Sequence, residues 1–410
     1  MNIPCIKCKG ADPLNSCGRS FCPIIAKAES MFKVQDMKVK EDFFGSSPAP
    51  FVGRYGYPDI NVGILAPPEE KETWIYDAPS HWANSDFNIS RIVDLRSSLV
   101  NSRFKANIKD QSKLLDISQE VGIASKPVDL EINLKDKPHF NIRTDPYLAP
   151  QGPNAQLKQA ILAENPKVDS RVDKVVSDVH QKASEAVNYL YSKDFDENFL
   201  MRMLSVGALG VKKSRKLVPT RWSITATDDI IAKNITKEIK DYPEAGYLAF
   251  YGGYLGNYYL ILMFPEPWSY ELFETYMPRA EWNISDRVQY MTDHEPYSGR
   301  KSYAENCAGG YYSVRLGILE KLKKMKRQSS VLALRFITGE YAVPLGVWVT
   351  REATRKTLKE RPIEFASREL MLDYARKLVK KKFGYGLDNL LNKSILIKDM
   401  KSQLKLRAFL

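Results

Sequence analysis

Residues 246–264, GYLAFYGGYLGNYYLILMF, decide the fold class more than any other stretch of the chain. Two aromatic and aliphatic runs stand on either side of glycines, a composition that predicts two strands joined in a hairpin. Residues 331–349, VLALRFITGEYAVPLGVWV, have the same character and predict a second hairpin turned at Gly339. Aromatic strands therefore dominate the chain after residue 241.

Other segments follow the periods of helices and of partly buried strands. VDLEINL (128–134) alternates as a strand does, whereas 170–191 and 363–383 carry apolar residues at helical spacing and predict one amphipathic helix each. Regular βαβ alternation, a G-x-G-x-x-G fingerprint and a Walker A motif are all missing from the sequence. We therefore expect a mixed, multi-domain α+β protein, and the sequence argues against an ordinary dehydrogenase or a P-loop ATPase.

Length and composition are those of a soluble globular protein. The chain has 410 residues, of which 44% are hydrophobic and 27% charged, which suggests two or three domains. No apolar run approaches the ~18 residues of a membrane span, and the N-terminus lacks an apolar signal core, so we expect a cytoplasmic protein without membrane contact. The expected parts are a metal module (1–24), an α+β core (25–310), a basic α+β region (311–400) and a tail (403–410).

The positive charge is concentrated near the C-terminus. Residues 311–410 hold 23 Lys+Arg and 9 Asp+Glu, a balance of +14, whereas the other residues balance to −2. Such asymmetry indicates a polyanionic partner, most often a nucleic acid. A solvated basic face that only maintains solubility is the alternative.

Four of the five cysteines lie close together, at Cys5, Cys8, Cys17 and Cys22. Two pairs separated by a short loop can surround one tetrahedral Zn²⁺ with thiolates, so we expect a structural zinc module. An iron–sulfur cluster and a pair of disulfides are the alternatives. Cys307 stands alone and is expected to be a small buried residue.

Two further segments have a composition suited to nucleic acid. GRYGYP (53–58) places Arg54 and two tyrosines beside glycines, which suits a phosphate or a base, or a structural turn. In residues 211–222, VKKSRKLVPTRW, a basic run precedes an arginine and an indole that could stack on an exposed base. The candidate contacts there are Lys212, Lys213, Arg215, Lys216, Arg221 and Trp222. Ser223, Thr225 and Thr227 alternate as on a short strand, and Asp228 and Asp229 are expected to cap the next helix.

VPTRWSITATDD (218–229) resembles the signature of the archaeal Nre family of DNA repair proteins. The four-cysteine N-terminus and FVGRYGYPDINVG (51–63) fit the same family, and the resemblance covers nearly the whole chain. It implies a role in the repair of damaged DNA together with the replication sliding clamp, PCNA. It carries over no catalytic residues.

The last eight residues, QLKLRAFL, match the PIP-type clamp-binding pattern. Gln403 would be the polar anchor, and Leu406, Phe409 and Leu410 would lie on one face of a single helical turn that inserts into an apolar pocket. Leu410 departs from the pattern, because an aromatic residue is more usual there. The alternative is a terminal turn that packs on its own domain.

Asp293, His294 and Glu295 form the remaining constellation, in a segment that Pro296 and Gly299 predict to be a loop. A histidine beside two carboxylates could perform acid–base work or hold a metal, so these three residues and Arg54 are the catalytic candidates. Neighbouring residues of a strand point to opposite faces, however, and a plain polar loop is the alternative. Three hypotheses follow: a DNA-binding repair factor, an enzyme acting on damaged or modified DNA (by phosphodiester cleavage, base removal or nucleotide-group transfer), and an RNA-binding factor.

Overall fold

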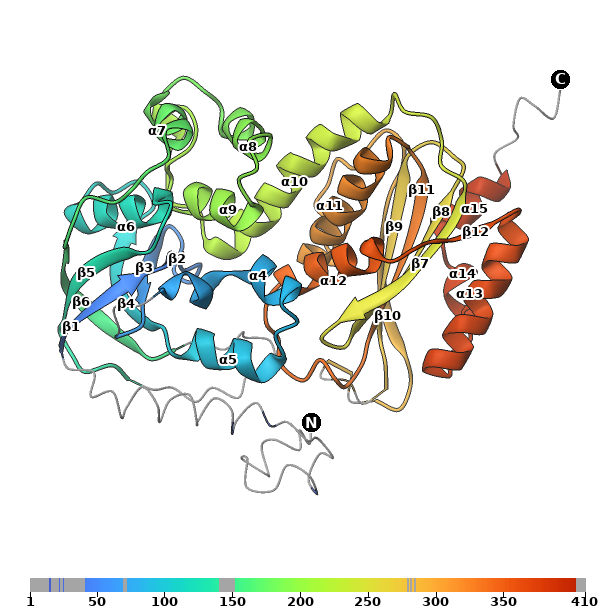
Figure 1. Ribbon diagram of the computed structural model, residues 1–410, viewed down its shortest axis with the longest axis horizontal. Helices are drawn as coiled ribbons and strands as arrows, with labels where there is room; N and C mark the ends of the chain where they lie inside the picture. The colour runs from blue at the N-terminus through green and yellow to red at the C-terminus, as the bar shows by residue number, and fades with distance from the viewer. Residues whose placement is uncertain are drawn as a thin grey trace. The chain divides into compact units, whose positions relative to one another are not determined.

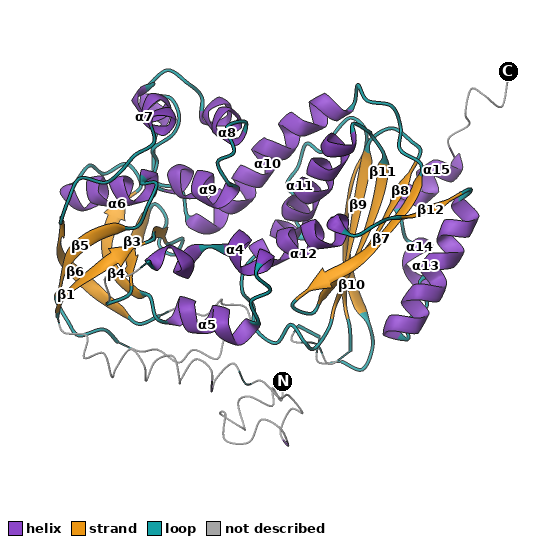
Figure 2. Ribbon diagram, in the orientation of Figure 1, coloured by secondary structure: helices purple, strands orange, loops and turns teal. Residues whose placement is uncertain are grey.

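The computed structural model describes residues 15, 22, 25, 41–68, 72–139, 152–278, 280, 282–283 and 285–402. The chain divides into two compact units. The barrel unit extends to Ile231 and includes Ala342–Gly346, and the sheet unit comprises Ala232–Tyr341 and the chain from Val347 onward. The described part is thus a mixed α+β protein with two sheets of six strands each (Figures 1 and 2).

The sheet unit contains the segment that set the expected fold class. Residues 246–264 form the predicted hairpin of β7 (Tyr247–Tyr254) and β8 (Asn257–Phe264), with a turn at Leu255 and Gly256. The strand order of this sheet is β10-β9-β11-β8-β7-β12. Its other strands are β9 (Ser269–Tyr276), β10 (Gln289–Glu295), β11 (Ser330–Ile337) and β12 (Ile363–Phe365).

Helices cover both faces of this sheet (Figure 2). On one face lie α11 (Ala308–Met325) and α12 (Trp348–Lys359). On the other lie α13 (Arg368–Phe383), α14 (Asp388–Leu391) and α15 (Ile395–Ser402), which bury an apolar cluster against the strands. Sheet strands with both faces covered become continuous apolar runs, as all eight buried residues of β11 show.

The second hairpin predicted from the sequence is wrong. β11 lies between β8, with which it pairs antiparallel, and β9, with which it pairs parallel. Both of its edges are therefore occupied, and no edge remains for the residues that follow Gly339. Those residues follow an irregular path with a few turns until α12 begins at Trp348.

In the barrel unit the strand order is β1-β5-β6-β4-β3-β2. The strands are β1 (Asp42–Ser47), β2 (Ala49–Val52), β3 (Asp59–Ala66), β4 (Val100–Asn107), β5 (Val128–Leu134) and β6 (Asn154–Leu162). Only Pro48 separates β1 from β2, so the two outermost strands of this order are halves of one bent strand. The sheet therefore closes into a barrel of five strands, in which β4 and β6 are parallel and every other pair is antiparallel.

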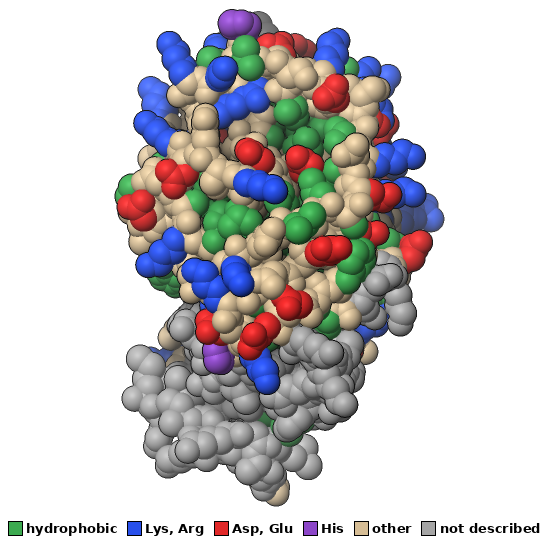
Figure 3. All heavy atoms as spheres, turned by 90° about the vertical axis from the view of Figure 1, so that its left-hand side faces the viewer, with side chains coloured by type: hydrophobic (Ala, Val, Ile, Leu, Met, Phe, Trp, Pro, Cys, Tyr) green, Lys and Arg blue, Asp and Glu red, His purple; other side chains and the backbone are tan. Residues whose placement is uncertain are grey.

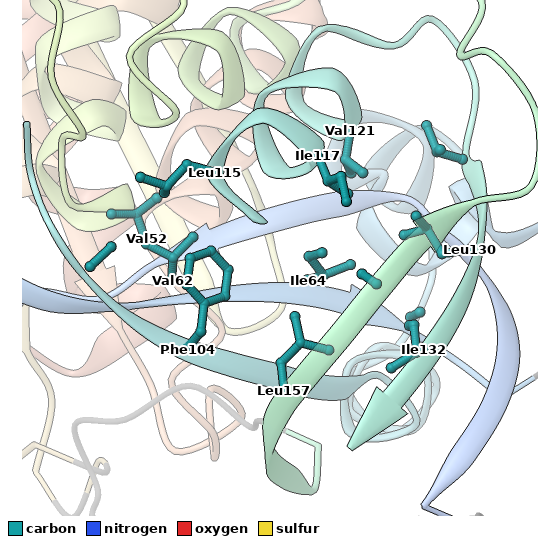
Figure 4. Close-up of a cluster of buried hydrophobic side chains, with 14 of the residues drawn as sticks. Val52, Val62, Ile64, Phe104, Leu115, Ile117, Val121, Leu130, Ile132 and Leu157 are labelled. Atoms are coloured by element: carbon teal, nitrogen blue, oxygen red, sulfur yellow. The ribbon is translucent and has the colours of Figure 1, made fainter. Parts of the chain in front are cut away.

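The bend and the interior of the barrel both follow from the sequence. Pro48 lacks an amide hydrogen, so it cannot donate to a strand ladder and interrupts the strand. Its carbonyl accepts a hydrogen bond from the Arg202 guanidinium, and burial lowers the pKa of that guanidinium. α6 (Lys113–Ile123) connects β4 to β5, and its Leu115, Ile117 and Val121 meet the inward side chains of the strands (Figure 4).

The remaining helices are η1 (Thr73–Asp77), α4 (Pro79–Asn84), α5 (Ile89–Ser97), α7 (Ser170–Ser177), α8 (Ala183–Tyr191), α9 (Glu197–Ser205), η2 (Lys212–Ser214) and α10 (Thr220–Ile239).

Two local predictions are corrected in this unit. Residues 170–191 form two helices, α7 and α8, because the Asp178 carboxylate accepts hydrogen bonds from the backbone of His180 and Gln181 at 2.9 and 3.1 Å and turns the chain. The predicted short strand after Arg221 is the first part of α10, which the Pro219 carbonyl starts by accepting the amide of Ser223 at 3.0 Å. Asp228 consequently lies buried within the helix and does not cap its start.

The division between the two compact units falls within α10. Strand β11, from the basic region, is inserted between β8 and β9 of the same sheet.

Candidate nucleic-acid interface

The loop of residues 53–58 joins β2 to β3 and displays two tyrosines at the surface. Gly56 has a φ of 85°, and a Cβ there would lie 2.6 Å from the Asp59 carbonyl oxygen, so the turn requires glycine. The Gly53 amide donates to Asn61 at 2.8 Å and continues the ladder to the base of the loop. Tyr55 is 68% exposed and Tyr57 42% exposed. The local backbone therefore holds aromatic side chains outward.

The start of α10 lies against this loop. The Thr220 hydroxyl accepts the Val52 amide at 2.9 Å, which ties the helix to the end of β2. Trp222, 44% exposed, places its ring 5.2 Å from that of Tyr57 at an interplanar angle of 55°. The two segments that carry the sequence signature, GRYGYP and VPTRW, thus meet on the surface of the barrel unit.

Positive charge accompanies these rings. The Arg54 guanidinium lies 4.9 Å from the centre of the Tyr55 ring and donates to its hydroxyl at 3.2 Å. Arg221 is exposed on the first turn of α10, a turn without acidic residues, where the helix dipole adds partial positive charge. We call Arg54, Tyr55, Tyr57, Arg221 and Trp222 the loop platform.

The basic run before α10 is divided by the structure. Lys212, Lys213 and Lys216 are exposed. Arg215 is half-buried, and burial lowers its pKa while its guanidinium donates to the carbonyls of Gly210 and Asp178 at 2.7 and 3.0 Å. Arg215 therefore holds the turn together, and the three lysines remain the surface cations of this run.

The outer face of β3 and β4 continues from the loop platform, and sequence reasoning missed it. Asn61 pairs in register with the exposed Lys105, and the half-buried Arg103 lies one pair further along, opposite Gly63. The signal was present in VNSRFKAN (100–107), in which Asn101, Arg103, Lys105 and Asn107 alternate with inward residues. The side of the barrel unit seen in Figure 3 intersperses Lys and Arg with Asp and Glu.

Asp293 and Glu295 are buried on β10, which corrects the predicted loop to a strand. Asp293 binds Arg300 at 2.8 Å and accepts the Cys307 amide at 2.7 Å. Glu295 accepts hydrogen bonds from Arg315 at 2.5 Å, Tyr311 at 2.7 Å and Trp268 at 3.2 Å. These bonds engage both carboxylates in packing α11 against the sheet.

His294 points to the opposite face of β10 from its two neighbours, so the three residues do not form one site. Burial lowers the pKa of His294, although Glu271, Asp399 and Glu295 act to raise it. Cys307 is buried as expected, and burial raises the pKa of its thiol, which favours the unreactive thiol form.

The predicted metal and clamp sites lie almost entirely outside the described residues. Of the four clustered cysteines only Cys22 is described, and it is half-buried. Within the described ranges no three His, Cys, Asp or Glu side chains are grouped to hold a metal ion. Residues 403–410 also lie outside, but the helix before them is firmly anchored: buried Glu271 accepts the amides of Ile395 and Leu396 at 3.0 and 3.1 Å and the Ser394 hydroxyl.

The barrel and its loop define a class of protein. Its five strands follow the order 1-2-3-5-4-1, with a parallel pair between the third and the fifth and a helix between the third and the fourth. This is the connectivity of the OB fold, a partly open Greek-key barrel.

The described helices include none with the length and apolar character to span a membrane.

The chain belongs to the archaeal Nre family. Residues 16–283 match the family's N-terminal region and residues 295–409 its C-terminal region. The chain is 35% identical to the DNA repair protein NreB of Archaeoglobus fulgidus, covering 97% of both chains. It is 36% identical to NreA of that organism (93% of this chain, 95% of the relative) and 34% identical to NreA of Haloferax volcanii (82% of each). No solved structure matches the chain.

Proposed function

We propose that this protein is a DNA repair factor that binds DNA through the loop platform and docks on the replication sliding clamp through residues 403–410. The relatives named DNA repair proteins, similar over nearly the full chain, support the pathway. The contact between Tyr57 and Trp222, flanked by Arg54 and Arg221, is the observation that supports DNA as the ligand.

Exposed aromatic rings and guanidinium groups are suited to DNA for separate reasons. A guanidinium offers a forked set of donors that matches phosphate, and an indole or phenol offers a face on which a base can stack. Two arginines beside three exposed aromatic side chains provide both contacts on one surface, where the loop of residues 53–58 meets the start of α10. The lysines at 212, 213 and 216 would extend the electrostatic attraction without specificity.

Docking on the clamp is supported by the motif and by its place in the chain. Gln403, Leu406, Phe409 and Leu410 follow directly after α15, whose first turn Glu271 binds to the sheet. A short anchored helix would present the motif to PCNA while the sheet unit stays folded. We further propose that Cys5, Cys8, Cys17 and Cys22 hold a structural Zn²⁺, since the spacing suits four thiolates.

Calorimetric titrations test this function. The full chain should bind the clamp of its own organism with micromolar affinity, and a Gln403→Ala, Leu406→Ala, Phe409→Ala variant should not. Both versions should bind DNA equally. Absence of clamp binding by the full chain would contradict the docking proposal, and absence of DNA binding at low salt would contradict the DNA proposal.

The enzyme hypothesis loses its carboxylate candidates, because Asp293 and Glu295 are engaged in buried ion pairs. The RNA-binding hypothesis predicts that RNA outcompetes DNA of the same sequence, so a competition titration separates it from the proposed function.

A further inference from the structure

We propose that the barrel unit takes single-stranded DNA, with an unpaired base stacked on the loop platform and the backbone laid along the outer face of β3 and β4. This inference rests on the proposed DNA binding and specifies its substrate. Three independent features carry it: the barrel connectivity, the exposed aromatic rings and the line of polar and basic residues on the two strands.

The connectivity locates the face. In an OB barrel the second and third strands, with the loop between strands one and two, form the surface that holds an oligonucleotide. Here the second and third strands are β3 and β4, and the loop is 53–58. The residues that the sequence singled out in GRYGYP therefore lie at the mouth of the expected binding face, a correspondence that the barrel order shows and the sequence does not.

The aromatic rings distinguish single strands from duplex. In a duplex both faces of each base are covered by its neighbours in the stack, so an exposed ring finds a partner only where a base is unpaired. Tyr57 and Trp222 are tilted by 55° and remain exposed for almost half of their surfaces, although two large rings in contact could have been buried. Tyr55, more exposed still, provides a second stacking surface in the same loop.

The strands provide the path for the backbone. Successive outward residues of one strand are about 6.6 Å apart, close to the rise between nucleotides of an extended strand. Lys105 is exposed opposite Asn61, and Arg103 lies two residues further from the loop. A chain that leaves the platform along β4 first passes the pair of Asp59 and Asn107 and then meets Lys105, an exposed cation that suits a phosphate. Arg103, which donates to Asn154 of β6, adds positive charge to the end of this path.

Fluorescence anisotropy with the full chain tests the inference. The probes are an oligothymidylate of about 15 nucleotides, near the largest site of one OB fold, a duplex of the same length and the corresponding oligouridylate. We expect the single strand to bind at least about tenfold more tightly than the duplex. Trp222→Ala should weaken single-strand binding by about tenfold, whereas Trp222→Phe should retain most of it.

Matched variants separate the site from general effects. Trp74, an indole 40% exposed on η1 of the same unit, is the control, and Trp74→Ala should leave binding unchanged. Lys105→Gln should weaken binding by a few-fold and reduce its dependence on salt. The emission of Trp222 should be quenched by the oligothymidylate, and the Trp222→Phe variant should lose that part of the quenching while it still binds.

The outcomes distinguish this inference from the function on which it rests. Equal affinity for duplex and single strand, with both affected by Arg54→Gln and not by Trp222→Ala, would keep DNA binding and overturn the single-strand assignment. Tighter binding of oligouridylate would overturn the choice of DNA. No binding of any probe at low salt would overturn the proposed DNA function as well. Urea midpoints equal to that of the wild type establish that the variants are folded.

Discussion

An arginine lies against a tyrosine ring in both units, yet the two pairs have opposite settings. In the barrel unit Arg54 lies 4.9 Å from the centre of the Tyr55 ring, and that ring faces solvent. In the sheet unit Arg315 lies 5.5 Å from the centre of the Tyr311 ring, but both are buried and both bind Glu295. An arginine and a tyrosine thus maintain the fold where a buried carboxylate binds both of them. The same two residue types are available to a ligand where they face solvent. Burial and partners, more than residue type, distinguish a structural cluster from a binding surface.

The largest test removes the carboxylate from the buried group. Glu295→Ala leaves Arg315 buried without its counter-charge, so the free energy of unfolding should fall by about 3–5 kcal/mol. Urea denaturation followed by circular dichroism measures this loss. Asp388→Ala, which removes the exposed partner of Arg376, should cost no more than about 1 kcal/mol. Similar losses in the two variants would contradict the contrast between buried and exposed groups.

A second buried carboxylate, that of Glu271, connects the sheet to α15. Glu271→Ala leaves the amides of Ile395 and Leu396 without their acceptor and should lower the free energy of unfolding by about 2 kcal/mol. Hydrogen exchange should also accelerate selectively in α15. Asn88→Ala, at the exposed N-cap of α5, is the comparison and should cost about 1 kcal/mol, with no change in α15. Unchanged exchange in α15 would show that Glu271 does not anchor that helix.

The surface arginines should affect binding and leave stability unchanged. Arg54→Gln and Arg221→Gln should each reduce the slope of log K against log salt by about 0.7, the value for one phosphate contact on single-stranded DNA. Arg91→Gln provides the matched control, because Arg91, on α5 of the same unit, also lies over an aromatic ring, 3.6 Å from the centre of Phe87, and is not one of the loop-platform residues. A salt slope that Arg91→Gln changes as much as Arg54→Gln would indicate non-specific attraction only.

The smallest effect is expected from pH. The folded-state pKa of His294 lies below its ordinary value near 6.5 because of burial, so the unfolded chain binds this proton more readily than the folded one. The contribution of neutral His294 to the free energy of unfolding is therefore present above pH 6.5. It is lost as the pH falls below 6.5 towards the folded-state pKa. Urea midpoints between pH 7.5 and 5 should decline more steeply for the wild type than for His294→Gln. Parallel curves would show that His294 does not contribute to this decline.

Local patterns predicted elements whose own residues contain the signal. The aromatic hairpin of residues 246–264 and the strand at VDLEINL appear as expected, because alternation and turn glycines act over a few residues. One prediction failed where distant strands decide, and another failed where a local helix start at Pro219 overrode the alternation. The chain after β11 could not form a hairpin once β8 and β9 occupied both edges, and the residues after Pro219 became helix where alternation suggested a strand.

By itself, the sequence determined the family, the mixed α+β class and the residue types of the loop platform, because these depend on motifs that are continuous in the chain. Only the tertiary structure decided that Tyr57 contacts Trp222, which lies 165 positions further along the chain. It also decided that Asp293 and Glu295 form buried ion pairs on one face of β10, opposite to the face of His294. Strand order and closure of the barrel bring such residues together through pairing between segments far apart in the chain. That pairing depends on which edges and faces remain open, and no local window of sequence contains this information.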